Sequence, residues 1–332
     1  MIMFVTKFNT MSEKDKSLTL GIGVFCDRLI DYAGMFPPAA LDINEAFENY
    51  CRYICGRYGW IINNFVVPAR KLNELSALVK GSDLTKPAGI SVILSGGRDE
   101  NEFLSNVQDD FKILHDVKSN RNIKVNALEA RIPAELTDSE NQDELIEFLI
   151  NFSALASEGY EDIPVFLEAV MGDDYEKAIL NVTESIACNN IPWGYKLRTG
   201  GTEPSAFPSS GAVAYAIMCC LEFRIPMKCT AGLHHPVRHR DENLGVSVHG
   251  FFNVFVAGLM AYALDLSEAE IIQVIEEKDP DKFEFTDDSV KHRDFRITVK
   301  QIAEAREKLM TSFGSCSFDE PVADLKTLGL LN

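Results

Sequence analysis

The most constraining feature of this chain is an alternation of short apolar, β-branched segments with longer segments of helical periodicity. The short segments lie at 27–35, 60–67, 89–94, 123–132, 164–171, 192–198, 226–232 and 282–286. Their starts are roughly 28–37 residues apart until the last interval, which is near 55 residues. Strands that alternate with helices predict right-handed parallel crossover units.

Eight such units predict an α/β fold, a single (β/α)8 TIM barrel with an insertion between strands seven and eight. We expect residues 1–17 to be an N-terminal tail, residues 18–332 to form the barrel domain, and 296–312 to be its final helix. An open doubly wound sheet is the alternative. No glycine-rich GxGxxG follows the first strand, which disfavours a dinucleotide-binding sheet.

The overall charge limits the partners. A formal net charge of −18 repels nucleic acid and anionic lipid, so neither is expected as a partner. The apolar run 251–264 is shorter than the roughly 20 residues of a membrane span. Eight cysteines without a CxxC pair are expected to be free and buried, in a cytoplasmic protein. The apolar residues near the N-terminus permit a homodimer.

Charged residues lie on the predicted strands, toward their carboxyl ends. In a barrel the active site lies at the carboxyl ends of the strands. The strand residues in question are Asp31, Glu129, Arg131, Glu168, Lys196, Arg198 and Lys228, and His234 and His235 follow the seventh strand. Charges on interior strands are costly to bury unless they are paired or functional. Together they predict one functional constellation.

The region 192–240 is locally cationic. It holds six lysines and arginines, Arg238 among them, against two acidic residues. A cationic cleft in an acidic protein attracts a small anion. Gly200 and Gly201 would let backbone N–H groups approach an oxyanion. We therefore expect a small anionic substrate, phosphorylated or carboxylated.

Other interpretations stay open. The two lysines could be ion-paired to Glu168 and Glu129 as structural elements of a non-catalytic, anion-binding barrel. A phosphoribosyl-transferring barrel would use the same cations on a pyrophosphorylated sugar. His249 is expected to be a structural hydrogen-bonding residue.

A metal site is a further alternative. His234, His235 and His239, with Glu129 or Glu168, could bind zinc or iron in a metal-dependent hydrolase or isomerase. Pro236 disrupts the helical i, i+4 presentation of His235 and His239, and the chain has no HExxH motif.

The strand-end residues resemble those of the deoxyribose-phosphate aldolase-like barrels, which are class I, Schiff-base-forming lyases. KLRTGG (196–201) is similar to the family's sixth strand, and KCTAG (228–232) to its seventh. LIDYAGMFPP, WIINNFVVP and VFLEA resemble its first, second and fifth strands. The family has an aspartate where this chain has Glu129, and its phosphate-binding glycines have no counterpart here. KLRTGG and AGLHHPVRH also resemble an uncharacterised group of barrel proteins.

The resemblance implies imine chemistry without a cofactor. Lys196 would be the nucleophile, and Lys228 would lower the pKa of Lys196 because a neighbouring ammonium disfavours a second charge. Glu168, Glu129 or His234 would be the general acid or base. The substrate-binding set would be Asp31, Arg131, Arg198, Gly200, Gly201, His235 and Arg238.

Overall fold

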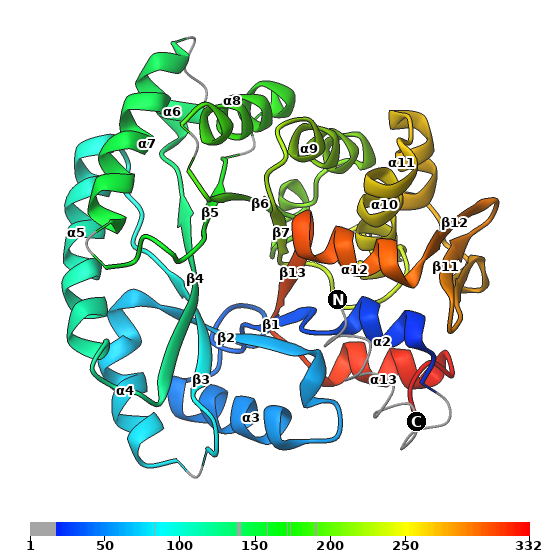
Figure 1. Ribbon diagram of the computed structural model, residues 1–332, viewed down its shortest axis with the longest axis horizontal. Helices are drawn as coiled ribbons and strands as arrows, with labels where there is room; N and C mark the ends of the chain where they lie inside the picture. The colour runs from blue at the N-terminus through cyan, green and yellow to red at the C-terminus, as the bar shows by residue number, and fades with distance from the viewer. Residues whose placement is uncertain are drawn as a thin grey trace.

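Eight parallel strands close into a barrel in the computed structural model (Figure 1). The structure describes residues 18–332 except 83, 138–140, 158, 171, 173 and 190, so the predicted tail at 1–17 lies outside the described residues. Around the barrel the strands are β1 (Ile30–Tyr32), β2 (Ile62–Pro68), β3 (Ala88–Ile93), β4 (Ile123–Arg131), β5 (Val165–Glu168), β6 (Gly194–Arg198), β7 (Met227–Thr230) and β13 (Met310–Ser315). The predicted TIM barrel is confirmed.

Helices surround the strands on the outside (Figure 1). They are α2 (Leu20–Cys26), α3 (Ile43–Cys55), α4 (Leu72–Lys80), α5 (Glu100–Val117), α6 (Ala134–Thr137), α7 (Gln142–Ala156), α8 (Tyr175–Cys188), α9 (Ser210–Glu222), α10 (Phe251–Leu264), α11 (Glu268–Ile275), α12 (Val299–Lys308) and α13 (Asp319–Thr327). Several begin at a polar cap. The side chain of Asp42 accepts two backbone N–H groups of α3, and Ser209 accepts that of Ala212 in α9.

The insertion after β7 is present, but the predicted eighth strand is wrong. Residues 283–285 form β10 of a separate antiparallel sheet with β11 (Ser289–His292) and β12 (Phe295–Thr298). A second small sheet pairs β8 (His239–Asp241) with β9 (Val246–Val248). The true eighth strand, β13, has the sequence MTSFGS, whose small and polar residues do not form an apolar run. The predicted helix at 296–312 therefore spans the end of β12, α12 and the start of β13.

The barrel wall separates an apolar exterior from a polar interior. Alternate strand residues join the helices in one hydrophobic core: Ile30, Phe65, Val67, Ile90, Val92, Leu128, Val165, Leu167, Tyr195, Leu197, Cys229 and Phe313. The residues between them point to the opposite face, because side chains alternate along a strand. These interior residues include a set of buried polar side chains that bond to one another across the lumen: Asp31, Asn64, Ser91, Glu129, Lys196, Lys228 and Ser312.

One helical stretch, Pro204–Glu222, is long and apolar enough by length and composition to cross a membrane. Its α9 portion packs against α8, α10 and α11 in the outer layer of the barrel. Val213, Ile217 and Cys220 on this helix are completely buried there. These contacts are those of a core helix.

All eight cysteines are free, as the sequence predicts. Four are buried: Cys26, Cys219, Cys220 and Cys229. The expected burial is wrong for Cys55 and Cys188, which are exposed near the carboxyl ends of α3 and α8.

The core between wall and helices gives the first testable prediction. Replacing Leu197, which has no exposed surface, with alanine leaves a cavity and should lower the free energy of unfolding by about 2–5 kcal/mol. Replacing Leu264, which is 36% exposed, should change it by less than about 0.5 kcal/mol. Urea unfolding of both variants measures the difference. Equal losses would contradict the assignment of this core.

Candidate active site

The centre of the barrel holds two lysines joined by one glutamate. Lys228 Nζ donates to Glu129 Oε1 at 2.6 Å, and Lys196 Nζ lies 2.8 Å from Glu129 Oε2. All three side chains are at most 5% exposed. Each carboxylate oxygen of Glu129 therefore faces a different ammonium group, with almost no contact with water.

Further charges extend this pair into a chain. Lys228 Nζ also contacts Asp31 Oδ2 at 2.7 Å, and Lys196 Nζ contacts Glu168 Oε2 at 3.1 Å. Arg198 Nε donates to Glu168 Oε1 at 2.8 Å, and its side chain is 41% exposed. The resulting ion-pair chain is Asp31, Lys228, Glu129, Lys196, Glu168 and Arg198, with alternating charges. It runs from the buried first strand to the carboxyl end of β6, where Arg198 is the last strand residue.

Strand register produces this arrangement. Lys196 pairs with Lys228 between β6 and β7, and Glu168 pairs with Lys196 between β5 and β6. Because neighbouring strands are parallel, paired residues point to the same side of the wall. The two lysines thus enter the lumen at the same level. Glu129 approaches them from β4 on the far side of β5.

Neutral donors complete the shell around the carboxylates. Asn63 and Asn64 both donate to Asp31 Oδ1, at 2.8 and 2.9 Å, while Ser312 donates to Asp31 Oδ2 at 2.6 Å. Ser91 donates to Glu129 Oε1 at 2.6 Å. These four residues were not part of the sequence prediction. The sequence signal that could have identified them is a polar residue between two apolar strand residues, such as Ser91 between Ile90 and Val92. Such a residue faces the lumen when its neighbours face the helices.

The electrostatics contradict one expectation. Burial alone would lower the pKa of Lys196, but the carboxylates of Glu129 and Glu168 outweigh burial and raise it. The pKa of Lys228 is raised in the same way by Asp31 and Glu129. Lys228 does lower the pKa of Lys196, as the sequence predicts, but the attraction of Glu129 and Glu168 outweighs this repulsion. The expected net depression of the Lys196 pKa is therefore wrong.

The glutamates show the complementary shift. Burial tends to raise the pKa of Glu129, but Lys196 and Lys228 together hold it far below the ordinary value. The pKa of Glu168 is lowered by Lys196 and Arg198 against the effect of its burial. Both glutamates are carboxylates and both lysines are ammonium ions at neutral pH.

The histidines take separate partners outside the ion-pair chain. His234 Nδ1 lies 3.0 Å from Glu320, and His235 Nδ1 lies 2.7 Å from Asp324, so both imidazoles contact α13. His239 Nδ1 lies 3.2 Å from the carbonyl oxygen of Val237. Within residues 18–332, the described parts contain no group of three His, Cys, Asp or Glu side chains able to hold a metal ion. The metal-dependent alternative has no ligand cluster in that part of the chain.

Three other residues named in the sequence analysis, Arg238, His249 and Arg131, also lie outside the ion-pair chain. Arg238 contacts His249 Nδ1 through its guanidinium at 2.8 Å, and its backbone N–H donates to Asn253. His249 is completely buried, its Nε2 bonds the carbonyl oxygen of Pro208, and burial lowers its pKa to about 4, so it is a neutral structural residue as expected. Arg131 is exposed at the end of β4, in register with Glu168.

The glycine pair has a packing role. A Cβ on Gly200 would lie 2.7 Å from the Cα of Gly232, and a Cβ on Gly201 would lie 2.7 Å from the Cβ of Ala206. Gly232 itself has a φ of +78°, which favours glycine. The loops after β6 and β7 therefore touch backbone to backbone. An anion-binding role for Gly200 and Gly201 stays a prediction.

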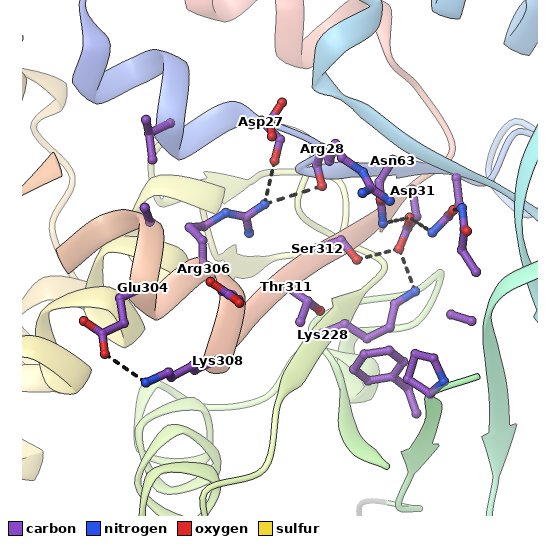
Figure 2. Close-up of a pocket in the computed structure, with 18 of the residues that line it drawn as sticks. Asp27, Arg28, Asp31, Asn63, Lys228, Glu304, Arg306, Lys308, Thr311 and Ser312 are labelled. Carbon is purple, nitrogen blue, oxygen red and sulfur yellow. Dashed lines mark hydrogen bonds and ion pairs between the residues drawn. The ribbon is translucent and has the colours of Figure 1, made fainter. Parts of the chain in front are cut away.

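A cavity of about 700 Å³ reaches the ion-pair chain from the amino ends of the strands (Figure 2). Its lining includes Asp31 and Lys228, together with Asn63, Asn126 and Phe166. Asn63 and Asn126 lie in the first halves of β2 and β4, and residues 300–308 of α12 form much of the opposite wall. Sequence reasoning placed the site at the carboxyl ends and missed this cavity.

Comparison with known proteins adds little to this geometry. No protein-family model matches the chain, and no curated protein matches it. Among solved structures, a crystal structure of mandelate oxidase with 3,3-difluoro-2-hydroxy-3-phenylpropionic acid is similar at a TM-score of 0.35 and 8% identity. The similarity covers 84% of this chain and 73% of the oxidase.

The ion-pair chain predicts a pH dependence of stability. Glu129 and Glu168 have lower pKa values in the folded state than the ordinary 4.5, so the unfolded state binds their protons first. The stability that they contribute is complete above about pH 4.5 and is lost as the pH falls toward the folded-state values. Urea unfolding between neutral and strongly acidic pH should show this loss.

Variants of the glutamates sharpen the measurement. At neutral pH, Glu129→Gln leaves two buried ammonium groups short of a counter-charge and should lower the free energy of unfolding by about 3–5 kcal/mol. Glu168→Gln, whose partner Arg198 reaches solvent, should cost less. Both variants should lose less stability on acidification than the parent protein. An unchanged acid dependence would mean that these carboxylates are not ion-paired.

Proposed function

We propose that this barrel is a Schiff-base-forming, aldolase-like lyase acting on a small anionic carbonyl compound, phosphorylated or carboxylated. Lys196 is the amine that forms the imine. The observation that carries this proposal is the sharing of Glu129 by Lys196 and Lys228, in a nearly dry lumen. A buried amine between two carboxylates has the charge environment that an imine intermediate needs.

The charge balance supports this chemistry. A lysine ammonium and a carbonyl compound give a protonated imine and water, so one positive charge is present before and after the step. Glu129 and Glu168, at 2.8 and 3.1 Å from Lys196 Nζ, would stabilise the iminium ion as they stabilise the ammonium ion. In the cleavage step the electron pair of the breaking C–C bond forms a C=C bond to the iminium carbon, and the C=N π pair moves onto the nitrogen to give an enamine. A carboxylate takes the hydroxyl proton of the fragment that leaves as an aldehyde, and protonation and hydrolysis of the enamine free Lys196.

Proton transfer falls to the same carboxylates. Lys196 must release a proton before its nitrogen attacks the carbonyl carbon, and Glu129 and Glu168 are within hydrogen-bond distance to accept it. The proton is returned when the carbinolamine hydroxyl leaves as water. Lys228 remains an ammonium ion against Glu129 and Asp31, and so keeps Glu129 from holding the transferred proton too tightly.

The anionic end of the substrate would be bound at the carboxyl end of β6. Arg198 offers a partly exposed guanidinium there. It is two residues after Lys196 on β6, so both side chains point to the same face of the strand. Arg131 is exposed on β4, which lies next to β5 in the barrel. His235 and Arg238 remain predicted contacts from the loop after β7, and His234 a predicted acid or base.

A second candidate function is an anion-binding barrel without catalysis. It is favoured by the completeness of the ion-pair chain, in which every lysine and carboxylate already has a partner. In this alternative Lys196 and Lys228 only stabilise the barrel, and no covalent adduct forms.

Borohydride trapping distinguishes the two. The parent protein is incubated with acetaldehyde, glyceraldehyde 3-phosphate or pyruvate, reduced with borohydride, and mapped by peptide mass spectrometry. We expect a reduced adduct on Lys196 with at least one compound, because the amine lies between two proton acceptors. Lys196→Met should abolish the adduct, whereas replacement of the exposed Lys80 should leave it unchanged.

Mapping the parent protein keeps the test independent of whether the variant folds. An adduct on Lys228 instead of Lys196 would reverse the assigned roles. Absence of an adduct on either lysine with all three compounds would reject the lyase and leave the binding barrel.

A further inference from the structure

The cavity at the amino ends of the strands lies on the opposite side of the barrel from the proposed substrate-binding arginine. In such barrels this end ordinarily serves stability, and the carboxyl end serves catalysis. Here the cavity of about 700 Å³ is within the range of ligand-binding sites. Its lining combines apolar surface from Val24, Ala127, Phe166 and Ala303 with charged and amide side chains.

Two guanidinium groups of the cavity lack a carboxylate partner. Arg28 Nε donates to the neutral side-chain oxygen of Asn63 at 3.0 Å. Arg306 donates to the carbonyl oxygens of Met310, Asp27 and Arg28, at 2.6, 3.0 and 3.4 Å. Figure 2 shows the bonds to Asp27 and Arg28. Neither arginine forms an ion pair with a carboxylate in the part of the chain that the structure describes.

The burial of Arg306 makes this lack of a counter-charge costly. Its Nε atom is buried and has no hydrogen-bond partner among the described residues. Burial lowers the pKa of Arg306 to about 10, as expected for a cation removed from water without full compensation. The carboxylates of Asp27 and Asp31 offset part of the effect of burial, and an anion in the cavity would offset more of it.

Two of the four acidic residues of the lining, Asp31 and Glu304, are engaged by other side chains. Asp31 accepts from Lys228, Ser312, Asn63 and Asn64. Glu304 is paired with Lys308 at 2.9 Å, and Glu307 is exposed. The lining as a whole carries five cationic and four acidic side chains, within a protein of net charge −18. The excess of positive charge at this position favours an anion.

We propose that this cavity binds a small organic anion, a carboxylate or phosphate ester with a short apolar body, through Arg28 and Arg306. Phe166, Ala303 and Val24 contact the apolar body of the ligand. Lys228 and Asp31 form the floor, so the bound anion lies next to the ion-pair chain. The site lies at the opposite end of the barrel from the proposed substrate-binding arginine, and it shares Lys228 and Asp31 of the ion-pair chain with the imine site.

Isothermal titration calorimetry tests the proposal with three probes: benzoate, phenyl phosphate and the uncharged benzamide. None of them is an aldehyde or ketone, so the result is independent of whether Lys196 forms an imine. We expect at least one of the two anions to bind, and benzamide to bind at least about tenfold more weakly. The stronger of the two anions identifies the head group.

Variants locate the binding. Arg28 has a φ of +50°, so Arg28→Asn retains a residue that tolerates this conformation and should weaken anion binding about tenfold or more. Ala303→Phe should abolish binding by filling the cavity. Arg121→Asn removes an exposed arginine at the same end of the barrel, outside the cavity, and should change nothing. Thermal unfolding confirms that each variant is folded.

The proposal is overturned if neither anion binds the parent protein. It is also overturned if benzamide binds as tightly as the anions, or if Arg28→Asn and Ala303→Phe bind them like the parent.

Discussion

The structure depends on the placement of one carboxylate, Glu129, between two buried ammonium groups. Moving an unpaired charge from water into the protein interior costs several kcal/mol. The two lysines of the barrel lumen are almost completely shielded from water, so each needs a carboxylate partner. Glu129 pairs with Lys196 and Lys228 at once, and Asp31 and Glu168 complete the pairing at either side. Without this arrangement, the polar interior of the barrel would be unstable.

The polar interior is possible because the apolar core lies elsewhere. The outward strand residues pack against the helices, where they exclude water over the whole circumference of the wall. The lumen is therefore free to hold charge, and it does so along a line from Asp31 to Arg198. One end of this line lies at a cavity and the other end at a partly exposed guanidinium. The two proposed sites thus share one set of ion pairs.

Sequence patterns predicted the barrel because each strand had its own apolar run. Seven of the eight strands were found in this way. The eighth, β13, escaped because MTSFGS presents small and polar residues to the lumen, and its pairing with β1 and β7 does not depend on apolar side chains. The segment 283–285 has the alternating aromatic residues typical of a strand, and it does form a strand, but in another sheet.

The sequence by itself determined the alternation of strands and helices and the residues that carry charge at strand positions. It could not determine the sign of the lysine pKa shifts, because that sign depends on distances of about 3 Å between side chains that are 28 or more residues apart in the chain. Nor could it show that Arg28 and Arg306 meet at the amino end of the barrel, since they lie near opposite ends of the chain. Only closure of the barrel brings β13 beside β1, and with it these cations into one cavity.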